Sequence, residues 1–302
     1  MKTGFTKFTA MNTPLIKHGW LRALIFLVIW ILVQDGLMNI LYNLLKPIIT
    51  HSGQADPSLK LLLIAILGCI VNLPVVFLFR KLIDRKTFLS LGFQFKTYEK
   101  HGYSGLLTAI FIFGLGTLIL LSTGILHFID FSFSGQDMML YILIMALVAI
   151  SEETVVRGYL LNNLLESFPK WIALMISATA FSLIHLLNPG FTWISLLGIF
   201  TGGILLGLNY MYTGNLWFGI FLHFGWNFLQ GPVLGYNVSG IETESLLIQS
   251  TNGPDWLTGG AFGFEGSLLS TLVILPAIAY FSFYYRRNEW ALAGKTEPGG
   301  VK

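Results

Sequence analysis

The stretch that decides the fold is residues 138–158, MMLYILIMALVAISEETVVRG. It has the composition of a membrane helix, except that Glu152, Glu153 and Arg157 stand near its end. A charged side chain at the centre of a bilayer costs about 2.5–3.5 kcal/mol on insertion scales, so such residues are kept mainly where they line a cavity and do chemistry. The sequence therefore directs the search for function to these three residues.

The composition as a whole is that of an integral membrane protein. Of the 302 residues, 54% are hydrophobic and 11% are charged, whereas soluble domains carry roughly a quarter charged residues. Lipid offers the backbone no hydrogen-bond partners, so the spanning segments should all be helices. The single cysteine, Cys69, excludes an internal disulfide and a cysteine cluster for metal.

Counting about 20 apolar residues for each crossing, the sequence predicts an all-α, polytopic membrane protein with about eight transmembrane helices. The predicted spans are Trp20–Leu45, Leu59–Phe79, Tyr103–Leu126, Met138–Leu164, Trp171–Leu187, Phe191–Tyr212, Leu216–Leu234 and Ser267–Tyr285.

These spans divide the chain into four parts. A cytoplasmic segment, 1–19, is followed by three transmembrane helices with a basic cytoplasmic loop, 20–136. The catalytic core of four transmembrane helices occupies 137–234. An outer loop, the last helix and a cytoplasmic tail make up 235–302, and the outer loop, 235–266, is either a lid or an unstructured hairpin.

The distribution of lysine and arginine predicts the orientation. An even number of spans puts both termini on one side, and that side then collects nearly all the basic residues, including the cluster in 80–100. Only Lys46 and Lys60 fall on the other side. The positive-inside rule therefore places both termini in the cytoplasm of a multi-pass protein of the cell membrane. The basic loop is expected to face anionic lipid, and no nucleic-acid partner is expected.

The three charges of the opening stretch are not equivalent. Glu153 and Arg157 are spaced i, i+4 with the acid first, the favourable order for an ion pair on a helix. Glu152 is turned about 100° away and lacks such a partner, so it is the better candidate for a working carboxylate. The structural alternative is that these polar side chains form hydrogen bonds that hold helices together.

Two later helices carry further candidates. His185 lies near the end of the fifth predicted span, while His223 and Asn227 are spaced i, i+4 and share a face of the seventh. Polar residues that join helices would give the same pattern. Counted along the helices, Glu152 falls near mid-membrane and His185 toward the outer end, so a span boundary or a helix must depart from regularity.

Together these residues provide the groups of a hydrolase. Glu152, His185, His223 and Asn227 supply a general base, a proton relay and oxyanion donors if they converge on one cavity. The same Glu152, His185 and His223 also provide one oxygen and two nitrogens for zinc, with a position left for water, as in a metalloprotease. Residue types alone leave both alternatives open, so the expected cofactor is either none or zinc.

The three motifs, taken in order, resemble those of a known family. They are Glu152-Glu-x-x-x-Arg157, Phe181-x-x-x-His185 and His223-x-x-x-Asn227. This pattern on successive membrane helices is similar to that of the CPBP family of intramembrane proteases, which includes the type II CAAX prenyl endopeptidases and bacteriocin-processing or self-immunity proteins.

The resemblance implies a role for each residue. Glu152 would activate water with help from His185, and His223 and Asn227 would stabilise the oxyanion. Glu153 and Arg157 would support the site. The substrate would be a membrane-associated or prenylated peptide or protein. A non-catalytic membrane scaffold or a transporter that uses the same buried polar cluster is the alternative, although the repeated halves common in transporters are not evident.

Overall fold

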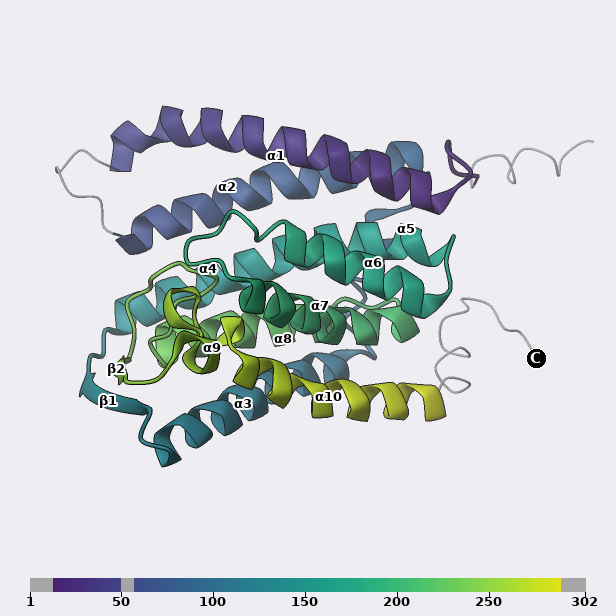
Figure 1. The fold of residues 1–302 in the computed structure, drawn as a ribbon. Coiled ribbons are helices and arrows are strands. Elements are labelled where there is room, and N and C mark those ends of the chain that lie inside the picture. Colours follow the sequence, from purple (N-terminus) through teal and green to yellow (C-terminus); the bar gives the residue numbers. More distant parts are fainter. Residues whose placement is uncertain (1–12, 50–56, 289–302) are drawn as a thin grey trace, which may run out of the picture.

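The computed structural model describes residues 13–49 and 57–288 (Figure 1). Expectations that concern 1–12 and 289–302, including the basic residues of those two segments, lie outside the described residues. Within the described part, six helical stretches are long and apolar enough to cross a membrane. They contain α1 (Gly19–Ile49), α2 (Pro57–Leu78), α3 (Glu99–Ser122), α4 (Gly135–Glu153), α7 (Trp193–Thr213) and α10 (Leu268–Arg287). The protein is an all-α, polytopic membrane protein, as predicted.

Two predicted spans are helices of less than full spanning length. The fifth corresponds to α6 (Lys170–Leu183), whose 14 residues cover about 21 Å at 1.5 Å per residue, short of the roughly 30 Å hydrocarbon core. It ends four residues before the predicted boundary, and the chain then turns. The seventh corresponds to α8 (Trp217–Phe228), which continues as a π-helical segment, η5 (Leu229–Val233).

The third predicted span is wrong at its end. The helix α3 stops at Ser122, and Leu126 begins a strand, β1 (Leu126–Phe131), that pairs antiparallel with β2 (Leu247–Thr251). This ribbon ties the outer segment 235–266 to the connection between α3 and α4. The outer segment also contains the short helix α9 (Asp255–Thr258), so it is folded, and the unstructured alternative does not hold.

The helices form layers around α8. Figure 1 shows α1 and α2 side by side at one side of the bundle, with α3 and α10 at the opposite side. Between these layers, α8 packs against α3, α4 and α7, and α7 packs in turn against α6 and α10. The start of α1 and the end of α10 lie at the same end of the bundle (Figure 1), as an even number of crossings requires.

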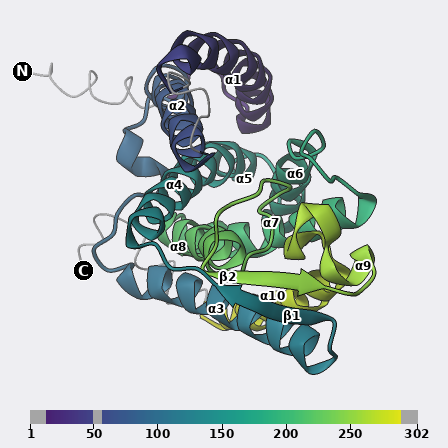
Figure 2. The ribbon, with the colours of Figure 1, turned by 90° about the vertical axis from the view of Figure 1, so that its left-hand side faces the viewer.

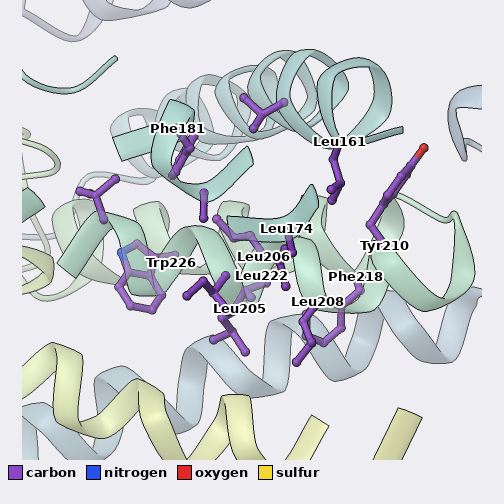
Figure 3. Close-up of a cluster of buried hydrophobic side chains, with 14 of the residues drawn as sticks. Leu161, Leu174, Phe181, Leu205, Leu206, Leu208, Tyr210, Phe218, Leu222 and Trp226 are labelled. Atoms are coloured by element: carbon purple, nitrogen blue, oxygen red, sulfur yellow. The ribbon is translucent and has the colours of Figure 1, made fainter. Parts of the chain in front are cut away.

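The centre of the bundle is an apolar core shared by α6, α7 and α8. Figure 3 shows Leu174 and Phe181 of α6, Leu205 of α7 and Leu222 of α8 as members of one cluster, and all four are buried. Helix association in lipid depends on close packing more than on water exclusion. A Cβ atom at Gly207 of α7 would lie 2.6 Å from a Leu174 methyl carbon, so the missing side chain permits the close approach of α6 and α7.

A cluster of charges joins α1 and α2 to the rest of the bundle at the end that carries the basic loop. Arg22 of α1 and Arg80 each bind one oxygen of the buried Asp84 at 2.9 Å. Glu166, which follows the short helix α5 (Asn162–Leu165), binds Arg22 and Lys86. Burial acts to raise the pKa of Glu166, but the hydrogen bonds and charges of Lys86 and Arg22 outweigh it and hold this pKa below its usual value. The cluster therefore anchors one end of the α1–α2 pair.

Candidate active site

The two glutamates of the first motif stand where α4 changes its winding. The α-helix ends at Glu153 and continues as a π-helical segment, η4 (Thr154–Leu161). Single π turns inside α-helices occur frequently at functional sites. The expected ion pair is present, with Arg157 Nη1 2.7 Å from Glu153 Oε1, and both side chains are fully buried.

Arg157 is also held from two other helices. Its Nη2 donates to the carbonyl oxygen of Gly203 on α7 at 3.1 Å. Its guanidinium carbon lies 4.3 Å from the ring centroid of Phe181 on α6, within the range of a cation–π contact. Arg157 thus fixes Glu153 in place and joins the first motif to the second.

His223 of α8 completes this buried network. Its Nδ1 lies 2.9 Å from Glu153 Oε1, and because the ion-paired carboxylate accepts hydrogen bonds, this nitrogen is the donor. The other ring nitrogen, Nε2, faces Glu152 at 3.9 Å from Oε2. That distance is too long for a direct hydrogen bond.

Glu152 differs from its neighbour in exposure and in its charged partners. Its side chain is 31% exposed, whereas that of Glu153 is 0% exposed. In both glutamates the Oε2 atom is buried and has no hydrogen-bond partner. The structure therefore pairs Glu153 with Arg157 and leaves Glu152, among the described residues, without an arginine or lysine partner, as the spacing predicts, with its side chain partly exposed.

His185 lies in the turn that follows α6, not in the helix itself. Its Nδ1 is 2.8 Å from the carbonyl oxygen of Phe181, which makes Nδ1 the donor and leaves Nε2 free for other contacts. The imidazole also packs edge-on against the Phe181 ring at 4.8 Å between centroids. Phe181 thus positions both Arg157 and His185.

One cavity of about 1050 Å³ brings the candidate residues together. Its walls come from α1, α2, α4, α6, α7, α8 and the outer segment 235–266, and its lining is mostly apolar. Four of its lining residues are those that the sequence singles out as catalytic, namely Glu152, His185, His223 and Asn227. Glu153 and Arg157 do not line the cavity and are buried beside it.

The zinc alternative requires Glu152, His185 and His223 to come together around one ion. Within residues 13–49 and 57–288, no three histidine, cysteine, aspartate or glutamate side chains come close enough together to hold a metal ion. Glu152, His185 and His223 line one cavity without forming such a cluster. The fourth polar group, the Asn227 carboxamide, suits an oxyanion better than a metal.

Two residues that line the cavity, Glu265 and Asn72, were not predicted from the sequence to belong to the site. Glu265 of the outer segment is buried and lines the cavity, where it accepts hydrogen bonds from Trp226 Nε1 at 2.8 Å and from the Ser239 hydroxyl at 2.8 Å. Only its acidic character within the outer segment marks it in the sequence. Asn72 of α2 also lines the cavity, and an asparagine inside an apolar span is a signal that could have identified it.

Comparison with known proteins gives a match to the part of the chain that contains the three motifs. Residues 134–229, which run from the start of α4 to the end of α8, match the family model described as type II CAAX prenyl endopeptidase Rce1-like. No curated protein and no solved structure matches the chain. The matched region contains all three motifs and all the residues that they contribute to the cavity. Through this segment the chain is similar to the type II CAAX prenyl endopeptidases, a group within the family that its three motifs resemble.

Proposed function

We propose that the protein is an intramembrane endopeptidase that hydrolyses a peptide bond of a membrane-associated or prenylated substrate, with water activated by Glu152. The observation that carries this proposal is the convergence of Glu152, His185, His223 and Asn227 on one cavity. These groups come from α4, from the turn after α6 and from α8. Together they provide a base, a relay and hydrogen-bond donors around a single apolar space.

Glu152 is assigned the role of general base. The Glu152 side chain is 31% exposed and lines the cavity, where its carboxylate can bind a water molecule. Glu152 takes a proton from this water molecule while the water oxygen attacks the carbonyl carbon of the substrate. The proton then passes to the leaving amine. His185, whose Nδ1 is bound to the Phe181 carbonyl oxygen, is assigned the relay in that transfer.

Asn227 and His223 are assigned the role of stabilising the oxyanion by donating hydrogen bonds to it. Both lie on one face of α8 and line the cavity, so the carboxamide N–H and, in the protonated form of the ring, the imidazole Nε2–H reach one point. Donors that are already oriented in a water-poor site stabilise the developing negative charge most effectively. The Glu153–Arg157 pair keeps the His223 ring in that orientation.

The cavity lining indicates how a substrate reaches the site. Its exposed members include Ile31 and Asp35 of α1, Leu183 of α6 and Ile241 of the outer segment. The basic segment 80–100 contributes no lining residue. We propose that substrates enter between α1 and α6, near the end of the bundle away from the basic loop. By the positive-inside rule this is the outer side of the membrane.

The substrate class is tested with the purified protein in lipid nanodiscs. A fluorescent peptide with an apolar membrane segment and a farnesylated peptide with a C-terminal CAAX sequence serve as probes. Cleavage of either probe in the presence of inhibitors of soluble proteases supports a peptidase, and the preferred probe defines the substrate. A protein that cleaves neither probe, and that leaves no new peptide termini in the membrane proteome of expressing cells, would contradict the proposal.

Removal of metal ions is expected to leave cleavage intact. The prediction follows from the donor set, because a carboxamide such as that of Asn227 is a poor zinc ligand and a good oxyanion donor. Cleavage rate and zinc content are measured after exhaustive chelation, with a zinc peptidase treated in parallel as the control for complete removal. Zinc in stoichiometric amounts that tracks activity would overturn the metal-free mechanism and make Glu152, His185 and His223 the ligands to test.

Substitution of Gly219 is expected to impair catalysis from behind the cavity wall. A Cβ atom at this position of α8 would lie 2.6 Å from Glu153 Oε2, and Glu153 cannot move away freely because it binds both Arg157 and His223. Gly219→Ala should therefore displace the carboxylate and lower kcat by ~10²-fold, the effect of a shift of about 1 Å in a catalytic group. Gly114→Ala is the matched control, since its Cβ would meet nothing within 4 Å. Wild-type kcat in Gly219→Ala would contradict this account of the site.

A further inference from the structure

A chain of buried hydrogen bonds links the wall of the cavity to the residue before Glu152. Trp30 Nε1 of α1 donates to Asn72 Oδ1 of α2 at 2.8 Å. The amide nitrogen of the same Asn72 donates to the Ser151 hydroxyl of α4 at 2.8 Å. All three side chains are buried, with exposed fractions of 7%, 4% and 3% respectively. Asn72 thus uses both ends of its carboxamide to connect three helices.

The position of Glu152 depends on this connection. Its Oε2 atom has no hydrogen-bond partner, so the placement of the carboxylate is set largely by the backbone of α4. Ser151 is the adjacent residue, in the last turn of α4 before the winding changes to π at Thr154. One turn earlier, Cys69 Sγ lies 3.4 Å from the Leu147 carbonyl oxygen. The same face of α2 therefore holds α4 at two successive turns.

The other end of this chain of hydrogen bonds, Trp30, lies where a substrate would make contact. Trp30 and Asn72 both line the cavity together with Glu152. Helix α1 packs on α2, α5 and η4, so Asn72 is the polar link between the middle of α1 and the catalytic helix. Figure 2 shows α1 and α2 as a pair set beside α4.

We infer that Asn72 is a positioning residue, which orients Glu152 through Ser151 and couples that orientation to the place of Trp30 in the cavity wall. This inference rests on the proposed function, because it assumes that Glu152 is the base. Neither Trp30 nor Asn72 lies within the segment that matches the family model. A buried asparagine without its two partners would leave unpaired polar groups, so the three residues should act as a unit.

The test measures kcat and KM for variants of each member of the chain. Asn72→Leu, Ser151→Ala and Trp30→Phe should each lower kcat by ~10-fold, as small displacements of a base do, and the first two should leave KM within a factor of two. Ser151→Thr keeps the hydroxyl and should restore most of the rate. The double variant Trp30→Phe/Ser151→Ala should be little worse than either single variant, because groups in one network are not additive.

A matched control separates positioning from stability. Asn209 of α7 is another fully buried asparagine, whose amide donates to the Tyr285 hydroxyl, and it does not line the cavity. Asn209→Leu should lower the melting temperature without changing kcat of the folded protein. Wild-type kcat in both Asn72→Leu and Ser151→Ala would overturn the inference, and so would an equal loss of kcat in Asn209→Leu.

A second readout needs no substrate. Cys69 is the single cysteine of the chain and contacts α4 one turn from Asn72, so its alkylation rate reports how tightly α2 is held to α4. Asn72→Leu should raise this alkylation rate. An unchanged rate would mean that the hydrogen bonds of Asn72 do not hold α2 to α4. Failure of the proposed function would be recognised differently, by wild-type cleavage in a Glu152→Gln variant.

Discussion

Glu152→Gln is expected to abolish peptide-bond cleavage while leaving the protein folded. Glutamine keeps the shape of the side chain but cannot take a proton from water, and loss of a general base costs at least on the order of 10²-fold in rate. Glu152 makes no ion pair with lysine or arginine among the described residues, so its replacement should not lower the melting temperature. His185→Ala should also lower the rate of peptide-bond cleavage, because it removes the proton relay.

The measurement is the initial rate of peptide cleavage, together with new peptide termini identified by mass spectrometry in membranes of expressing cells. Glu99→Gln, at the start of α3, is the matched control for removal of a carboxylate that does not line the cavity, and it should cleave at the wild-type rate. A Glu152→Gln protein with full activity would refute the assignment of Glu152 as the base.

Glu153→Ala is expected to lower both stability and activity. The Arg157 side chain is 1% exposed, so loss of Glu153 leaves a buried guanidinium without its anionic partner, which typically costs roughly 3–5 kcal/mol. The change also removes the acceptor at His223 Nδ1 and frees the ring to rotate. Stability is measured as the free energy of unfolding in detergent, and activity as the cleavage rate at a temperature where the variant is folded.

The double variant Glu153→Ala/Arg157→Leu tests the origin of the loss in stability. It removes both buried charges, so its free energy of unfolding should lie closer to the wild-type value than that of Glu153→Ala, while its activity should remain low. If Glu153→Ala instead kept wild-type stability and lost all activity, the two glutamates would have exchanged roles, and Glu153 would be the working carboxylate.

The sequence predicted the fold class because membrane helices carry their signal locally. Six stretches of the predicted length and apolar composition are present, and errors occurred where the local signal is ambiguous. The third predicted span ends at Leu126, yet this residue begins β1, which forms by pairing with β2 more than a hundred residues later in the chain. A partner so distant leaves no mark in the local pattern.

The site was predicted to the extent that its residues belong to motifs on single helices. Glu152 and His185 line one cavity in spite of their conflict in predicted depth, and His185 lies in the turn after α6, which ends at Leu183. Gly219, by contrast, matters only because Glu153 lies opposite it on another helix. Such a requirement is created by packing, and no periodicity within α8 records it.

The place of α1 and α2 in the cavity wall has a consequence for how the enzyme can diversify. The proposed chemistry is encoded between residues 134 and 229, the segment that matches the family model, whereas one side of the chamber comes from a helical hairpin outside it. That hairpin contributes side chains such as Ile31 and Gln34, which face the chamber without belonging to any of the three motifs. Under the proposed function, chemistry and selectivity would be carried by separate parts of the chain, so mutation of the hairpin would give evolution a route to new substrates with the reaction unchanged.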